Sequence, residues 1–117
     1  MKTESVFISA IKREVVFYIG KNQQENFNVI DMGSPDDLWF HAKHVPSCHV
    51  VCEIPDDNIC KNDLLYIIKT GIILCKSNTN KIKNIEKVEF IYTQVKNITK
   101  TKVAGCVITK DEKTIIL

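Results

Sequence analysis

The chain has 117 residues, of which 44% are hydrophobic and 26% are charged, and its formal net charge is +2 at pH 7. This balance excludes an intrinsically disordered chain, and the length suits one domain that can bury a substantial core. The longest apolar stretch, residues 64–75, is interrupted by Lys69 and Thr70 and is too short to cross a bilayer. We expect a single domain over residues 1–117, without membrane contact and, since no signal peptide is recognisable, in the cytoplasm.

The first elements predicted along the chain are a hairpin and a short helix. Residues 6–8 and 15–19 are rich in β-branched and aromatic side chains, which predicts two paired strands. Asn22 followed by Glu25 resembles a capping box. It predicts a helix over about residues 23–32.

Residues 37–51 form the most distinctive segment, because they contain the single Trp and all three His of the chain. Residues 37–43 alternate as a strand does, so their side chains point to opposite faces of a sheet. One face carries Leu38, Phe40 and Ala42, and the other carries Asp37, Trp39, His41 and Lys43. The first set suits a core. The second set combines an acid, an indole, an imidazole and an ammonium group, which solubility alone does not require. We interpret it as a candidate binding surface.

Residues 48–54 are predicted to form the partner strand. In an even register, where the two residue numbers of each pair sum to an even value, His49 lies on the face of Trp39 and His41. Such pairs are Lys43 with His49 and His41 with Val51. A slip of one residue would move His49 to the other face. We predict the shared face, which places two imidazoles beside the turn at residues 20–22.

Two interpretations of Trp39 are open. Its ring could stack on an unpaired base, a contact worth roughly 1–3 kcal/mol. Alternatively, the segment at residues 23–33 covers it, and Asp37 accepts its indole N–H or caps a turn. Asn26 is interpreted as an amide that holds the fold.

After a loop at residues 55–58, the second half of the chain predicts the main helix, over about residues 62–77. Asp63 is a candidate N-cap, and the apolar positions follow a 3.6-residue repeat. Gly71 inside the helix costs about 1 kcal/mol relative to Ala and suggests close packing. This helix is expected to cover the sheet.

The C-terminal third predicts three further strands and a basic segment. Residues 88–92 alternate as a strand, and residues 105–109 and 114–117 are predicted to pair as a terminal hairpin. Residues 96–102 are expected to be irregular. Because the strands come in hairpins, we expect an α+β fold with a mostly antiparallel sheet, one long helix and one short helix.

Charge is distributed unevenly. Residues 76–102 contain seven Lys and two Glu, a net charge of +5, whereas residues 1–75 carry −3. Such a segment can attract a polyanion, although a solvated lysine-rich surface competes with that interpretation. With one Arg in the chain, bidentate reading of guanine is nearly unavailable.

The clustered His and Cys residues raise two other possibilities, a metal site and a Cys–His dyad. The spacing of His41, His44, Cys48, His49 and Cys52 matches no zinc motif. Cys48 and His49 are adjacent in a predicted strand, so their side chains diverge and cannot act as nucleophile and base. We therefore expect no metal, no cofactor and no catalysis, and five reduced cysteines.

Residues 20–22 are Gly-Lys-Asn with Glu-Asn at 25–26, residues 37–41 read Asp-x-Trp-x-His, and residues 46–50 are Pro-Ser-Cys-His-Val. Together these segments resemble the NFACT-R domain of the short standalone type, from about Glu14 to the C-terminus. That family is the predicted RNA-binding module of fibronectin-binding-protein-like and ribosome-quality-control factors. Two features depart from its pattern: His44 stands where an acid is usual, and Ser47-Cys48 where small residues are usual.

The resemblance implies a non-catalytic RNA-binding module with tRNA, rRNA or the ribosome as partner. The residues expected to meet nucleic acid are Lys21, Asn22, Trp39, His41, Lys43, His49, Lys96, Lys100 and Lys102. Binding should be led by the phosphate backbone and discriminate poorly between sequences. Alternatives are a protein-interaction adaptor among ribosome or quality-control proteins, and a general nucleic-acid binder that also takes DNA.

Overall fold

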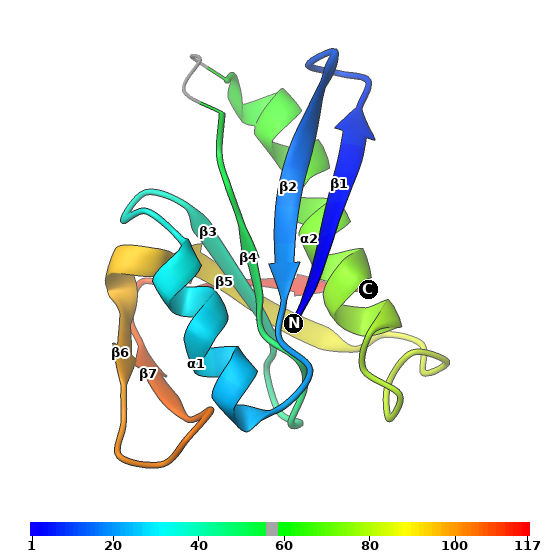
Figure 1. The fold of residues 1–117 in the computed structure, drawn as a ribbon. Helices are drawn as coiled ribbons and strands as arrows, with labels where there is room; N and C mark the ends of the chain where they lie inside the picture. The colour runs from blue at the N-terminus through cyan, green and yellow to red at the C-terminus, as the bar shows by residue number, and fades with distance from the viewer. Residues whose placement is uncertain (56–58) are drawn as a thin grey trace.

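The computed structural model describes residues 1–55 and 59–117, so most of the loop predicted at residues 55–58 lies outside the described residues. The elements in chain order are β1 (Lys2–Ile8), β2 (Arg13–Ile19), α1 (Gln23–Met32), β3 (Leu38–Ala42), β4 (Val50–Cys52), α2 (Lys61–Ser77), β5 (Glu89–Gln94), the 3₁₀ turn η1 (Val95–Asn97), β6 (Ile98–Lys100), β7 (Val107–Thr109) and β8 (Lys113–Ile116). Figure 1 shows α1 and α2 on either side of a twisted sheet.

The strands form two antiparallel sheets. Six of them are ordered β1-β2-β4-β3-β5-β8, and β6 pairs with β7 alone. This confirms the predicted α+β class with a mostly antiparallel sheet. The hairpin of β1 and β2 is also as predicted, although both strands begin earlier than the sequence indicated.

Helix α1 begins where the capping box predicted. Asn22 Oδ1 accepts the backbone N–H of Glu25 at 2.9 Å. The Glu25 carboxylate in turn accepts the backbone N–H of Lys21 at 2.9 Å. The first bond satisfies an N–H group that a helix start leaves without a partner, and the second holds the residue just before the cap.

Helix α2 packs on one face of the sheet and builds the larger core. Its buried residues Ile67, Ile68, Gly71, Ile72 and Cys75 meet side chains from β2, β3, β4 and β5. The predicted N-cap is wrong. The helix begins after Cys60 without a side-chain cap, and Asp63 instead lies in the first turn, where its charge suits the helix dipole.

The opposite face of the sheet is also buried. Val29 and Ile30 of α1 pack with Trp39 and Val51, and Ile98 and Val107 of the small sheet lie against them. The alternation in β3 is therefore confirmed, but its second face is covered by α1 and the β6–β7 pair instead of being an open surface (Figure 1).

Two C-terminal predictions are wrong. Residues 98–100 form β6, so the segment 96–102 is only partly irregular, and the predicted hairpin between residues 105–109 and 114–117 does not form. Strand β7 pairs with β6, while β8 pairs with the edge of β5. Short alternating segments do not specify their partner, and here Asp111, with φ of 53°, redirects the chain between the two sheets.

Gly71→Ala is expected to destabilise the protein by about 1–3 kcal/mol. A Cβ at this position would lie 2.4 Å from the Phe40 ring, so the packed core must move. Helix propensity alone predicts the opposite sign, a gain of about 1 kcal/mol. Urea unfolding measures the difference. Lys69→Ala, at an exposed site of the same helix, should change stability by less than about 0.5 kcal/mol. Equal stability of Gly71→Ala and wild type would contradict the close contact.

Candidate nucleic-acid interface

The register of β3 and β4 brings Trp39, His41 and His49 together. Trp39 lies opposite Val51 and Phe40 opposite Val50, so paired residue numbers sum to 90. The specific pairs predicted from sequence, which sum to 92, are wrong by two residues. Because two residues are one full period of a strand, the predicted shared face is nevertheless correct.

The three rings form a compact cluster. Trp39 Nε1 donates a hydrogen bond to His49 Nδ1 at 3.2 Å. The His41 ring stacks on Trp39 with 5.6 Å between centroids and 5° between planes, and it meets the edge of His49 at 4.8 Å. Trp39 and His49 are each only 1% exposed. Trp39 is therefore covered, and open base stacking on its face is excluded by this packing.

Asp37 does not accept the indole N–H. Its carboxylate accepts the backbone N–H groups of Ser34 and Ile54, both at 2.8 Å, so it closes the turn before β3 and holds the chain after β4. The turn-capping alternative for Asp37 is thus the correct one.

Asn26 fixes the backbone beneath the rings. Its Oδ1 accepts the N–H of His49 at 3.0 Å, while the His49 carbonyl accepts the N–H of Gly20 at 3.0 Å. A Cβ on Gly20 would lie 2.3 Å from Asn26 Oδ1, so only glycine allows this approach. The prediction that Asn26 holds the fold is confirmed.

Burial keeps both histidines neutral. Desolvation, together with the charge of the neighbouring His41, lowers the pKa of His49 to about 3. Desolvation also lowers the pKa of His41. Since Nδ1 of His49 accepts the indole N–H, a neutral His49 carries its proton on Nε2.

A pocket of about 520 Å³ opens beside the histidines. It lies between the β3–β4 loop and the loop that joins β6 to β7, and His41, His49, Ile91, Gly105 and Val107 are among its lining residues. His41 is half-buried and lines this pocket, and its ring stacks on Trp39.

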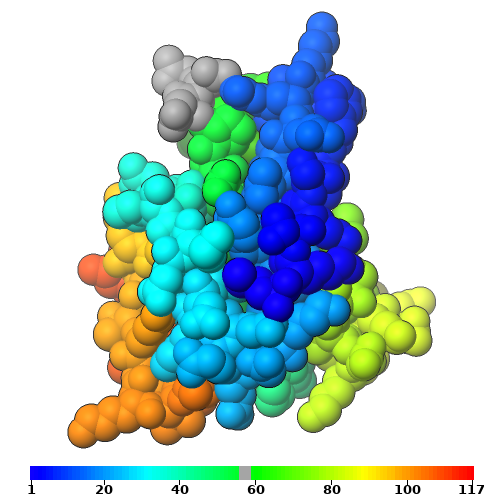
Figure 2. All heavy atoms as spheres, in the orientation of Figure 1, coloured from blue at the N-terminus to red at the C-terminus, as the bar shows by residue number. Residues whose placement is uncertain are grey.

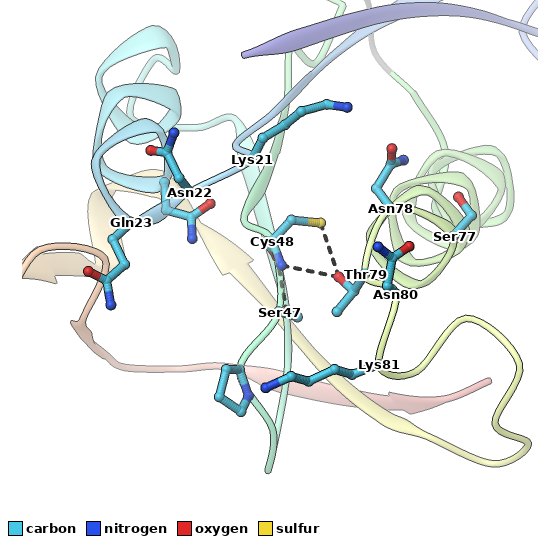
Figure 3. A pocket seen from close by; sticks show the side chains of 12 residues that line it. Lys21, Asn22, Gln23, Ser47, Cys48, Ser77, Asn78, Thr79, Asn80 and Lys81 are labelled. Atoms are coloured by element: carbon cyan, nitrogen blue, oxygen red, sulfur yellow. Dashed lines mark hydrogen bonds between the residues drawn. The ribbon is translucent and has the colours of Figure 1, made fainter.

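A second pocket of about 590 Å³ lies at the start of α1. Lys21, Asn22 and Gln23 stand on one side of it and residues 77–81 on the other, with Ser47 and Cys48 between them (Figure 3). Gln23, Asn26, Pro46 and Ser47 line both pockets. No Asp or Glu is among the described residues that line either one. The two pockets therefore form one continuous surface without negative side chains.

The predicted lysines differ in their surroundings. Lys43 pairs with Glu89 at 3.5 Å, Lys96 with Asp36 at 3.1 Å and Lys100 with Asp31 at 2.7 Å. Lys102 is exposed in the loop after β6. Among residues 1–55 and 59–117, no carboxylate lies within ion-pair distance of the Lys21 or Lys81 ammonium.

The sequence reasoning missed Lys81 and the polar residues before it. They were counted in the basic segment 76–102, but nothing in their spacing signalled that the end of α2 meets the start of α1. Figure 2 shows the surface of α1 between the projecting segments that follow α2 (yellow-green) and β6 (orange).

Metal binding and membrane crossing are two other possible roles. The described part of the chain has no group of three or more His, Cys, Asp or Glu residues placed to bind a metal ion. None of its helices combines the length and apolar character that crossing a membrane requires.

The sequence and the fold of this chain both match known proteins. The model of the NFACT protein RNA binding domain matches residues 5–114. This chain belongs to that family. It is 32% identical over 88 residues to coiled-coil domain-containing protein 25 of Danio rerio, covering 72% of this chain and 41% of that protein. The homologue of that protein in Dictyostelium discoideum is 27% identical over 96 residues, covering 82% and 47%.

A solved structure shares the fold of this NFACT RNA-binding domain. The C-terminal part of the fibronectin/fibrinogen-binding protein from Streptococcus suis superposes with a TM-score of 0.78 at 23% identity, covering 100% of this chain and 45% of that one. The present chain spans less than half the length of the relatives that it matches.

The unfolding free energy is expected to fall between pH 6.5 and pH 5. The folded-state pKa values of His41 and His49 lie below the ordinary value of 6.5, so the unfolded chain binds more protons in this range. Each proton contributes a slope of up to about 1.4 kcal/mol per pH unit. Urea unfolding at several pH values measures it.

His49→Gln should reduce that slope, since glutamine offers an acceptor to the indole without titrating. His44→Gln is the matched control, because it replaces an exposed imidazole that lies outside the buried ring cluster. An identical slope in wild type and His49→Gln would show that His49 does not titrate differently on unfolding.

Proposed function

We propose that this domain binds RNA non-catalytically in the cytoplasm, through the continuous surface formed by the two pockets. The pocket lined by Lys21 and Lys81 (the Lys21–Lys81 pocket) adjoins the pocket lined by His41 and His49 (the histidine pocket), and no carboxylate lines either one. This observation carries the proposal. Membership of the RNA-binding family supports the class of ligand.

The Lys21–Lys81 pocket is suited to the phosphate backbone. Lys21 and Lys81 come from opposite walls, with the Asn22 side chain on the first wall and the Asn78 and Asn80 side chains on the second (Figure 3). Two ammonium groups attract phosphates, and the amide N–H groups donate to phosphate oxygens. The positive end of the α1 dipole adds to this attraction.

The histidine pocket is suited to an unpaired base. His41 presents ring atoms to this pocket, and its neutral imidazole both donates and accepts hydrogen bonds. Ile91 and Val107 provide apolar contacts nearby. These groups impose little sequence preference, so a single-stranded or loop segment of tRNA or rRNA is the proposed ligand, free or in the ribosome.

Lys21→Gln and Lys81→Gln should each weaken binding several-fold for all RNA sequences alike. The slope of log affinity against log salt should fall by roughly 0.7 for each lysine removed. Fluorescence anisotropy with a labelled single-stranded RNA, at about 50 mM and about 200 mM salt, measures both effects.

Lys69→Gln is the matched control, because this exposed lysine of α2 lines neither pocket. Lys100→Gln should have a smaller effect than either pocket variant, since Lys100 is already paired with Asp31. Absence of RNA binding at low salt would refute the proposal. Equal affinity for a DNA strand of the same sequence would make the domain a general nucleic-acid binder.

A second function, that of a protein-interaction adaptor, is favoured by the outer face of α2. Tyr66 and Ile73 lie seven residues apart on one stripe and are 56% and 50% exposed. Exposed apolar side chains on one stripe suit a protein partner. In this case the double variant Tyr66→Ser/Ile73→Ser should lose co-sedimentation with ribosomes while keeping its RNA affinity. Co-sedimentation that depends on Lys21 and not on this stripe would favour RNA contact alone.

A further inference from the structure

Two thiols face each other on the α2 side of the segment that leads into β4. Cys48 Sγ donates to the Cys75 carbonyl oxygen at 3.4 Å, and Cys75 Sγ donates to the Cys48 carbonyl oxygen at 3.3 Å. Because each thiol reaches the backbone of the other residue, the two cysteines are in direct contact. A disulfide requires such a close approach.

The surroundings of the two sulfurs differ. Cys48 is 9% exposed and lines the Lys21–Lys81 pocket (Figure 3), whereas Cys75 is fully buried and does not line it. Thr79 Oγ1 lies 3.4 Å from Cys48 Sγ as a donor. The Cys75 thiol, the Thr79 hydroxyl and the Lys21 charge lower the pKa of Cys48 to about 7. The neighbouring Cys48 thiol, together with burial, raises the pKa of Cys75. Cys48 is thus the nucleophile of the pair.

We propose that Cys48 and Cys75 form an oxidisable dithiol, in which peroxide enters through the Lys21–Lys81 pocket and the product is a disulfide. The Cys48 thiolate attacks one peroxide oxygen, the O–O bond breaks, and the departing hydroxide takes a proton to become water. The Cys48 sulfenic acid that results is attacked by Cys75, which loses its proton. The S–S bond forms as the S–O bond breaks, and a second water leaves. Two electrons pass from the dithiol to peroxide.

The other three cysteines provide internal comparisons. Cys52 is buried, and burial raises its pKa, so it should react slowly. Cys60 and Cys106 are exposed, so access does not limit their oxidation. Selective reaction of Cys48 and Cys75 would therefore reflect the hydrogen-bonded pair and not accessibility.

The test treats the wild-type protein with a small excess of hydrogen peroxide, blocks remaining thiols under denaturing conditions, and maps non-reduced peptides by mass spectrometry. The expected result is a peptide pair joined through Cys48 and Cys75 that appears before Cys60 or Cys106 is oxidised and disappears on reduction. In Cys75→Ser, dimedone should trap Cys48 as its sulfenic acid. The wild-type result stands even if this variant folds poorly.

Three results would overturn the proposal. The first is that Cys48 and Cys75 are still free thiols after Cys60 and Cys106 have been oxidised. The second is a disulfide between another pair of cysteines. The third is conversion of Cys48 to sulfinic acid without a disulfide to Cys75. None of these measurements involves RNA, so the inference and the proposed RNA binding fail or survive separately.

Discussion

The buried hydrogen bond from the Trp39 indole to Nδ1 of His49 is the interaction on which the rest of this structure depends. Neither partner has access to water, so leaving either one unpaired would cost about 1–3 kcal/mol. The bond forms only if β3 and β4 keep their register and if His49 is neutral. It therefore links the strand pairing, the protonation state of the histidines and the position of the His41 ring that borders the pocket.

The central strands β3 and β4 are buried on both faces, so their polar chemistry is accessible mainly at the strand ends. The larger core lies under α2, and the smaller one lies under α1 and the β6–β7 pair. Polar function is therefore concentrated where loops from distant parts of the chain meet. The start of α1, the β3–β4 loop, the segment after α2 and the β6–β7 loop all contribute to the two adjoining pockets.

Residues 46–49 separate the histidine cluster from the cysteine pair. His49 faces the Trp39 cluster beside α1, while its neighbour Cys48 contacts Cys75 and Thr79 of the α2 region. Adjacent residues in extended backbone point to opposite sides, so the segment presents an imidazole to one pocket and a thiol to the other. The same alternation separates the two side chains and prevents them from acting as one dyad.

The sequence by itself determined the elements whose signals are local. The capping box at Asn22 and Glu25, the helical repeat of α2, the close packing at Gly71 and the shared face of Trp39, His41 and His49 follow from periodicity and short-range hydrogen bonding. The family motif was also recognisable from the sequence alone, because Asp37, Trp39 and His41 lie within one strand and the turn that precedes it.

Only the tertiary structure decided which surfaces remain open and which charges are neutralised. Trp39 is covered by α1 and the small sheet. Lys96 and Lys100 pair with acids more than fifty residues away in the sequence. The Lys21–Lys81 pocket likewise joins two segments that are distant in sequence. Strand partners at the C-terminus were undetermined for the same reason. Alternation specifies a face, whereas long-range packing selects the neighbour.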